Sequence, residues 1–292
     1  MEITKDTIIL VTGASSGIGA ALAHDLAKFG AKIAICARRT ELLEKVAVEI
    51  KAAGGVPLVI TADLSKKDEA EGAVLKTIEE FGGIDILVNN AGRGNRASVE
   101  DTTPEQLESM FALNVFSLWY TTAAALPHMK QQNRGHIINI SSIVGKIAYP
   151  FNSAYIAAKH AVVGFTAALR TELVETGIEA TVICPAGVET EWASVTEGGS
   201  IGEIFFHGIQ NSRTIAKERG LELAPLQRMM KASEISKLII EVIKNPQKSD
   251  VLTHEGTEEL ALEAAQDRPA FEKKNLSLYL GMRKAYEDFK ER

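Results

Sequence analysis

The sequence predicts an α/β fold in which helices cover both faces of one doubly wound parallel sheet. Short apolar runs alternate along the chain with longer stretches of helical period. The runs are apolar throughout, which is typical of strands buried on both faces of a parallel sheet. A glycine-rich turn follows the first run and leads directly into helix-forming residues, as a strand-to-helix connection in this fold class requires.

The expected sheet has seven strands, each a short apolar run. They are Thr7–Val11, Lys32–Ala37, Val56–Thr61, Ile84–Val88, His136–Ile140, Glu179–Ile183 and Asp250–Leu252. Helices are expected between them. In Thr40–Ala53 one face collects Leu43, Val46 and Ile50, and one face of the next helix collects Val74, Ile78 and Phe81.

Residues 1–190 contain no repeat or linker, so residues 1–292 are expected to form a single domain. Two segments interrupt the alternation of strands and helices. Residues 191–230 combine glycines with apolar and aromatic residues and are expected to form a flap over a site. Residues 255–292 are highly charged but are expected to dock through one apolar helical face, formed by Leu278, Met282, Tyr286 and Phe289.

Composition restricts the class of protein. A chain of 292 residues that is 46% hydrophobic can bury a large core, and its net charge of -6 argues against a general nucleic-acid binder. Cys36 and Cys184 lie inside apolar runs and are interpreted as buried thiols in a reducing compartment. No secretory leader and no apolar run of membrane length is found, so a soluble cytoplasmic protein is expected. No metal site is expected, because none of the histidines has a metal-ligand spacing. They are His24, His128, His136, His160, His207 and His254.

The turn after the first strand is suited to a dinucleotide. It reads Thr12-Gly13-Ala14-Ser15-Ser16-Gly17-Ile18-Gly19. Such a turn lets a pyrophosphate approach backbone N–H groups at a helix N-terminus. Gly13 would form the turn, Gly17 would allow the close approach, and Gly19 would allow the helix–sheet contact. A plain glycine turn is the alternative for this segment taken alone.

Arg38 and Arg39 end the second strand, where an acid commonly binds the ribose diol of NAD. No acid occurs before Glu41, and a guanidinium can hold a 2′-phosphate by paired hydrogen bonds. NADP(H) is therefore the preferred cofactor, with NAD(H) as the alternative. The two arginines could also be solvated residues before a helix.

Polar residues follow the next two strands as well. Asp63-Leu64 comes after the third strand, and Asn89-Asn90-Ala91-Gly92 comes after the fourth. Open α/β sheets bind ligands at the carboxyl ends of their strands, so these residues are candidate cofactor contacts. Ordinary turn chemistry is the alternative for each segment alone.

Ser142, Tyr155 and Lys159 are suited to proton transfer. Tyr155 and Lys159 lie one helical turn apart and share a helix face. Two unit charges about 4 Å apart at an effective dielectric of about 20 interact by about 4 kcal/mol, which would lower the pKa of the phenol by up to about 3. Taken alone, the pair could be an ordinary amphipathic pair, and Ser141 and Ser142 could simply end a strand.

The ordered set of motifs resembles the short-chain dehydrogenase/reductase family in its compact branch, over about residues 5–190. The motifs are Thr12–Gly19, Asp63, Asn89–Gly92, Asn114, Ser142, Tyr155–Lys159 and Pro185–Thr190. Ser142 also precedes Tyr155 by the spacing that this family uses. The resemblance implies a Rossmann fold and hydride transfer.

The resemblance also implies residue roles. Tyr155 would be the general acid in reduction and the base in oxidation, and Ser142 would hold the substrate oxygen. Lys159 would lower the Tyr155 pKa and hold the nicotinamide ribose, and Asn114 would anchor a water that links Lys159 to solvent. The loop beside the nicotinamide would supply Pro185, Gly187, Val188 and Thr190, although Ala186 replaces the family's usual glycine.

The resulting expectation is an NADP(H)-dependent carbonyl reductase or alcohol dehydrogenase acting on an apolar ketone, aldehyde or alcohol. The alternatives are a 3-oxoacyl-thioester reductase and a non-catalytic NADP(H)-sensing protein. A homodimer through helices around 104–129 and 153–175, or a homotetramer, is expected from the resemblance. The expected pocket roof is Trp192, Ile201, Ile204, Phe205 and Phe206. The expected opposite wall is Arg93, Ile143, Val144, Tyr149 and Phe151.

Overall fold

A seven-stranded parallel sheet, in the order β3-β2-β1-β4-β5-β6-β9, forms the centre of the molecule. The computed structural model describes residues 1–191, 196, 201–247 and 249–291. The strands are β1 Ile8–Thr12, β2 Lys32–Ala37, β3 Val56–Thr61, β4 Ile86–Asn89, β5 Gly135–Ile140, β6 Ile178–Cys184 and β9 Val251–Leu252. All seven expected strands are confirmed, and the expected β4 is displaced most, because Ile84 and Asp85 precede the paired residues.

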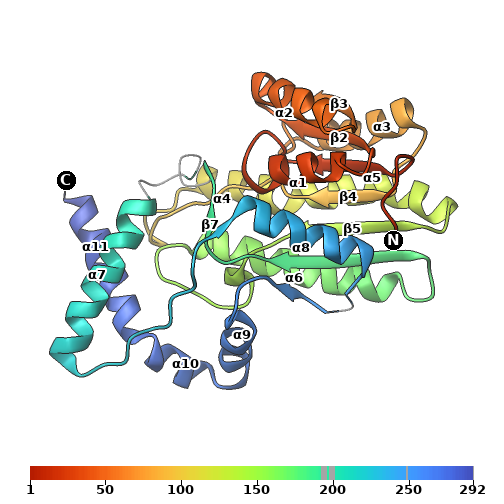
Figure 1. Ribbon diagram of the computed structural model, residues 1–292. Helices are drawn as coiled ribbons and strands as arrows, with labels where there is room; N and C mark the ends of the chain where they lie inside the picture. Colours follow the sequence, from red (N-terminus) through yellow and green to blue (C-terminus); the bar gives the residue numbers. More distant parts are fainter. Residues whose placement is uncertain (192–195, 197–200, 248, 292) are drawn as a thin grey trace.

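Two helical layers sandwich this sheet (Figure 1). Helices α1 Gly17–Ala27, α2 Thr40–Ala52 and α8 Ala232–Lys244 bury their apolar residues against one face. Helices α3 Lys67–Phe81, α5 Ser117–Gln131 and α6 Ser153–Glu172 cover the other face. The sheet is therefore buried on both sides, which is why its strands are apolar throughout.

The strand order reverses between β1 and β4, which are neighbours in the sheet but not in the sequence. Connections leave the carboxyl ends of β1 and β4 in opposite directions, so a crevice opens there. Open α/β sheets bind their ligands at such a switch point. The polar segments that follow these strands consequently meet at one edge of the sheet.

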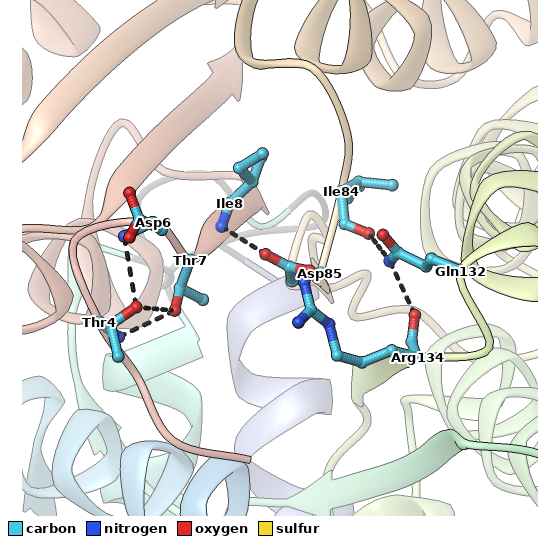
Figure 2. A network of polar contacts seen from close by, with 8 residues as sticks. All are labelled: Thr4, Asp6, Thr7, Ile8, Ile84, Asp85, Gln132 and Arg134. Atoms are coloured by element: carbon cyan, nitrogen blue, oxygen red, sulfur yellow. Dashed lines mark hydrogen bonds and ion pairs between the residues drawn. The ribbon is translucent and has the colours of Figure 1, made fainter.

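The opposite edge, at the amino ends of the strands, is closed by a polar network (Figure 2). The buried carboxylate of Asp85 accepts a hydrogen bond of 2.9 Å from the backbone N–H of Ile8 and one of 2.6 Å from Nη2 of Arg134. Nε2 of Gln132 donates to the carbonyls of Ile84 and Arg134. These bonds tie β1, β4 and the entry to β5 together on the side away from the crevice.

A continuous helical stretch, Pro104–Gln131, has the length and hydropathy of a membrane span, so the expectation that no apolar run reaches this length was wrong. The stretch consists of α4 Pro104–Phe111, a π-helical turn η1 Ala112–Phe116, and α5. It packs against α3 and α6 within the helical layer. Packing in this layer accounts for much of its apolar character.

Three helices follow the sheet: α9 Thr257–Gln266, α10 Arg268–Lys274 and α11 Leu276–Lys290. Helix α11 packs along α7 Ile201–Arg219, and Figure 1 shows the pair at the end of the molecule away from the N-terminus. A Cβ atom on Gly281 would lie 2.3 Å from the carbonyl oxygen of Gly208, so glycine is required where the two helices cross. Of the expected apolar face, Leu278, Met282 and Tyr286 are buried and Phe289 is half-buried.

Candidate active site

A cleft of about 850 Å³ lies at the carboxyl ends of the central strands. Almost every site residue expected from the sequence lines it. These are Gly13, Ser15, Ser16, Gly17, Ile18, Arg38, Arg39, Asp63, Leu64, Asn90, Ala91, Gly92, Ser142, Tyr155, Lys159, Pro185, Gly187, Val188 and Thr190. Gly19 and Asn114 are the expected residues outside this lining, and both lie directly behind it.

One end of the cleft is formed by the start of α1. Ser16 precedes the helix in an extended conformation, its side chain caps no N–H group, and the first turn holds no acid. Gly17 adopts φ 58°, and a Cβ atom on Gly19 would lie 2.6 Å from the carbonyl oxygen of Gly13. The N–H groups of the first turn therefore remain available to an anion, so this end of the cleft fits a pyrophosphate.

Asn90 fixes the shape of the glycine turn through hydrogen bonds to its backbone. Its Nδ2 donates to the carbonyls of Thr12 at 3.0 Å and Gly13 at 3.2 Å, and its backbone N–H donates to Oγ1 of Thr12. The backbone N–H of Ala91 donates to the same hydroxyl. Asn90 therefore joins β4 to the turn after β1.

Arg39 lies across the glycine turn. Its Nη2 donates to Oγ of Ser16 at 2.6 Å and to Oγ of Ser15 at 3.0 Å, and its Nη1 lies 3.3 Å from Oε2 of Glu191. Arg38 is exposed and lines the same end of the cleft near Asp63. Partial burial disfavours the Asp63 carboxylate, but hydrogen bonds from Ser65 and the nearby charge of Arg38 lower its pKa.

Ser142, Tyr155 and Lys159 come together where β5 ends and α6 begins. Ser142 and Tyr155 both line the cleft, and the Ser142 hydroxyl is near enough to act on the acidity of the Tyr155 phenol. Oγ of Ser142 also donates to the carbonyl of Pro185 at 3.2 Å. Nζ of Lys159 lies 5.6 Å from the centre of the Tyr155 ring and donates to the carbonyl of Ile140 at 3.0 Å. Both side chains are buried in the floor of the cleft. They therefore do not form the ordinary amphipathic pair that the sequence left open as an alternative.

The expected effect of Lys159 on the acidity of Tyr155 was wrong. Burial raises the pKa of Tyr155 above its ordinary value, and the Ser142 hydrogen bond opposes this only in part. Burial lowers the pKa of Lys159 to about 8. Removal from water disfavours both charged forms, and this effect outweighs the attraction between ammonium and phenolate.

Asn114 lies behind the cleft, in the π-helical turn η1. Its Nδ2 donates to the carbonyls of Arg93 and Met110, each at 3.0 Å, while its buried Oδ1 has no partner among the described residues. A Cβ atom on Gly92 would lie 2.7 Å from this Oδ1 and 3.4 Å from Nζ of Lys159. An acceptor with an unfilled hydrogen-bonding capacity therefore faces the lysine across Gly92, as a bound water between them would require.

The loop after β6 is held by a histidine that sequence reasoning assigned to packing or to the surface. Nδ1 of His254 accepts from the backbone N–H of Ala186 at 3.2 Å, and its Nε2 lies 2.8 Å from the carbonyl of Gly187. Thr190 packs over the glycine turn, because a Cβ atom on Gly17 would lie 3.2 Å from its Cγ2. The loop with Ala186 thus has a fixed path between the glycine turn and β9.

The remaining wall of the cleft is largely apolar. Of the expected residues, Arg93, Ile143, Val144, Tyr149, Phe205 and Phe206 line it. Phe151 instead stacks on Tyr286 with ring centres 4.3 Å apart, and Ile204 is buried away from the lining. Trp192 and the Ile201 side chain lie outside the described residues. Sequence reasoning missed Leu260, Leu278 and Met282, which the C-terminal helices bring to the cleft, and also Arg96.

Known proteins resemble this chain over most of its length. The model of the short chain dehydrogenase family matches residues 7–198. Dehydrogenase/reductase SDR family member 7B of Bos taurus is 38% identical over 204 residues, which cover 67% of this chain but only 63% of that protein. D-beta-hydroxybutyrate dehydrogenase of Rhizobium meliloti is 36% identical over 76% of this chain and 90% of that protein.

Solved structures share the fold. A short chain dehydrogenase/reductase from Burkholderia phymatum in complex with NAD has a TM-score of 0.78 at 24% identity, and the match covers 92% of this chain and 96% of that one. An alcohol dehydrogenase from Thermococcus sibiricus complexed with 5-hydroxy-NADP has a TM-score of 0.70 at 24% identity, with coverage of 85% and 96%. The family match and the fold together establish that the chain belongs to the short chain dehydrogenase family.

Proposed function

We propose that the protein is an NADP(H)-dependent oxidoreductase that interconverts a ketone or aldehyde with an alcohol, and that Tyr155 transfers the proton. The observation that carries this proposal is the meeting of Ser142, Tyr155 and Lys159 in one cleft with the open N-terminus of α1. A non-catalytic nucleotide sensor would have no use for a serine hydroxyl placed beside the Tyr155 phenol in this cleft.

The cofactor fits the residues at one end of the cleft. The first turn of α1 would hold the pyrophosphate, Asp63 would face the adenine, and Arg38 or Arg39 would hold a 2′-phosphate. The loop that contains Gly187 and Thr190 would lie beside the nicotinamide. When bound, the cofactor supplies or accepts the hydride.

Tyr155 and Ser142 act on the substrate oxygen. In reduction the Tyr155 hydroxyl gives its proton to the carbonyl oxygen, while the Ser142 hydroxyl donates a hydrogen bond to the charge that develops there. The raised pKa of Tyr155 keeps the phenol protonated at neutral pH, which suits a proton donor. In oxidation the same phenol, once ionised, accepts the proton of the alcohol.

Lys159 and Asn114 would return the proton to Tyr155. The Lys159 ammonium stabilises the phenolate that forms as Tyr155 gives up its proton. Nζ of Lys159 and the unpartnered Oδ1 of Asn114 lie within 3.4 Å of one point beside Gly92. A water that bridges these two side chains near Gly92 would connect them and carry a proton from solvent.

The names of the relatives leave the substrate open. One is a D-beta-hydroxybutyrate dehydrogenase, which favours a hydroxy acid, whereas dehydrogenase/reductase SDR family member 7B names no substrate. A 3-oxoacyl-thioester reductase remains the second candidate, because the family fold and the apolar wall would also admit an acyl chain. Assays with acyl-carrier thioesters separate the two.

We further propose a cytoplasmic homodimer. Cys36 and Cys184 are free, buried thiols, which supports a reducing compartment. The outer faces of α5 and α6 expose aromatic surface, since Trp119 is 56% exposed and lies 5.0 Å from the ring of Phe165. These are the helices that the sequence assigned to the dimer interface.

The replacement Tyr155→Phe tests the mechanism. It removes the proton donor and keeps the ring, so turnover of a panel of ketones should fall by at least about 10²-fold. Binding of NADPH, followed by its fluorescence, should persist. Tyr120→Phe on α5, outside the cleft lining, is the matched control and should leave both readouts unchanged. Undiminished turnover by Tyr155→Phe would refute the role of Tyr155.

A further inference from the structure

Arg96 places a buried positive charge in the wall of the cleft. The residue is 6% exposed, and its side chain lines the same cleft as Tyr155. Its Nε is fully enclosed and has no hydrogen-bond partner among the described residues. By contrast, neither Nη1 nor Nη2 is both enclosed and without a partner. The end of the guanidinium therefore faces the cleft.

No carboxylate in the described part of the chain forms an ion pair with Arg96. Burial lowers its pKa to about 10, and no neighbouring charge opposes this effect. Asp63 and Glu189 also line the cleft, but neither makes a bond to Arg96. A buried guanidinium without a counter-charge is costly, and natural proteins rarely keep one unless something pairs with it.

The protein holds this segment in place. Two residues beyond Arg96, the buried backbone N–H of Ser98 donates to the Tyr286 hydroxyl of α11 at 3.1 Å. Asp101 then accepts hydrogen bonds from the Tyr286 hydroxyl and from Nζ of Lys290. Gly94, Asn95 and Ala97 around Arg96 are also buried. The backbone of Arg96 is thus fixed between the sheet and the C-terminal helix, so the charge cannot easily move out to water.

The other residues that line the cleft define the rest of the ligand. Ile143, Val144, Leu260, Leu278 and Met282 give the substrate half of the cleft an apolar surface. Asn152 adds a polar side chain that lines the cleft and is 9% exposed, and its buried Oδ1 has no partner in the part of the chain that the structure describes. An apolar surface that holds the Arg96 guanidinium without a counter-charge from the described residues matches a molecule with an apolar body and one anionic end.

We propose that Arg96 binds a carboxylate on the substrate, so that the enzyme acts on apolar oxo acids or hydroxy acids. This inference rests on the proposed oxidoreductase function. The guanidinium would supply two parallel N–H donors to the two carboxylate oxygens, a geometry that arginine provides and lysine does not. The substrate thereby provides the counter-charge that the described part of the chain does not supply.

The first test compares acids with their methyl esters. Aliphatic oxo acids of increasing chain length, with the ketone at different distances from the acid, are assayed with NADPH against the matching esters. The wild type should prefer the best acid over its ester by about 10²-fold in kcat/KM, and Arg96→Met should reduce this ratio at least about tenfold. Arg96→Lys should restore part of it. Arg283→Met, which removes an exposed arginine from α11, is the matched control and should keep the wild-type ratio.

The outcomes separate the two proposals. If the wild type reduces neither acids, esters nor neutral ketones, the oxidoreductase proposal fails. If esters and acids are reduced equally well, and Arg96→Met changes nothing, the oxidoreductase proposal stands and the carboxylate site is refuted.

The second test needs no turnover. Decanoate is titrated into the Tyr155→Phe protein by calorimetry, with and without Arg96→Met, and decyl phosphate is titrated in parallel. Decanoate should bind and raise the melting temperature only while Arg96 is present. Tighter binding of the phosphate would overturn the choice of a carboxylate. Because Arg96 has no partner among the described residues, Arg96→Met without ligand should melt no lower than wild type, whereas a marked loss of stability would show that Arg96 is structural and refute the site.

Discussion

Nε2 of His254 lies 2.8 Å from the carbonyl oxygen of Gly187, while its Nδ1 accepts the backbone N–H of Ala186 at 3.2 Å. One imidazole ring, buried to 5% exposure, therefore satisfies two neighbouring backbone groups in the loop beside the expected nicotinamide position. This arrangement fixes the tautomer, because Nε2 must carry the hydrogen and Nδ1 must accept.

Replacing His254 with phenylalanine should weaken NADPH binding. The change leaves the N–H of Ala186 without an acceptor and removes one of the two donors to the carbonyl of Gly187, which keeps the N–H of Met230. Each lost bond of this kind costs about 0.5–1.5 kcal/mol. The Kd for NADPH should therefore rise about tenfold, since about 1.4 kcal/mol corresponds to a factor of ten. Fluorescence titration measures it. The Kd of His254→Gln, which can keep one of the bonds, should lie between those of the wild type and His254→Phe. Equal NADPH affinity in all three proteins would show that the ring does not position the loop.

The sequence predicted the sheet and the position of the site for a physical reason. Strands such as Ile8–Thr12 are buried completely, so their residues must be apolar, and this signal is local. Arg38, Asp63 and Ser142 each follow a strand, and parallel strands bring their carboxyl ends to one edge. These residues could therefore be assigned to one cleft from the sequence alone.

What the sequence could not predict depends on burial and on distant contacts. The acidity of Tyr155 is governed by the loss of water around it, which no local pattern records. In the sequence, Arg96 resembles any loop arginine. Its position is fixed by a hydrogen bond between the nearby Ser98 and Tyr286 of the terminal helix, which only the fold reveals. His254 was assigned to packing because its partners, Ala186 and Gly187, lie far away in the sequence.

The pH dependence of the two reaction directions should differ. Burial raises the pKa of Tyr155 and lowers that of Lys159 to about 8. At neutral pH the phenol is protonated and the amine is charged, as reduction requires. The kcat/KM for reduction should therefore be level below about pH 8 and fall above it as Lys159 loses its charge. Oxidation needs the phenolate, so its kcat/KM should rise by up to about tenfold for each pH unit through the neutral range. A reduction profile that stays level well above pH 8 would contradict the role of the Lys159 charge.

Cofactor preference should depend on Arg38 and Arg39. Arg39 already contacts Ser15 and Ser16 of the glycine turn, while Arg38 is exposed beside it. Removing a charged hydrogen-bond partner of a phosphate costs about 1.5–3 kcal/mol, so Arg38→Ala or Arg39→Ala should weaken NADPH binding by about 10- to 100-fold. The Kd for NADH, which lacks the 2′-phosphate, should change much less. If both variants keep the wild-type ratio of the two dissociation constants, the 2′-phosphate assignment fails.

The proposed dimer can be dissociated at Trp119. This side chain is 56% exposed on α5, and a glutamate there would place a charge in the interface. Light scattering should show a dimer for wild type and a monomer for Trp119→Glu. Val48→Glu alters an equally apolar side chain, 67% exposed on α2, and should remain dimeric. A wild type that is monomeric at every concentration tested would rule out the dimer.

Stability should depend on Asp85 far more than on its partner Arg134. The carboxylate is 4% exposed and accepts the N–H of Ile8 at the start of β1, whereas the Arg134 side chain is 62% exposed (Figure 2). Asp85→Ala leaves the buried N–H of Ile8 without an acceptor, which should lower the free energy of unfolding by about 1–3 kcal/mol. Arg134→Ala only opens the carboxylate to water and should cost about 1 kcal/mol or less.

Urea denaturation measures the free energy of unfolding of both variants, with Asp85→Asn as the variant that keeps an oxygen for Ile8. Since the network lies at the amino ends of the strands and the cleft at their carboxyl ends, kcat of the folded fraction should not change. An Arg134→Ala variant as unstable as Asp85→Ala would show that the ion pair, and not the buried hydrogen bond, stabilises this edge of the sheet.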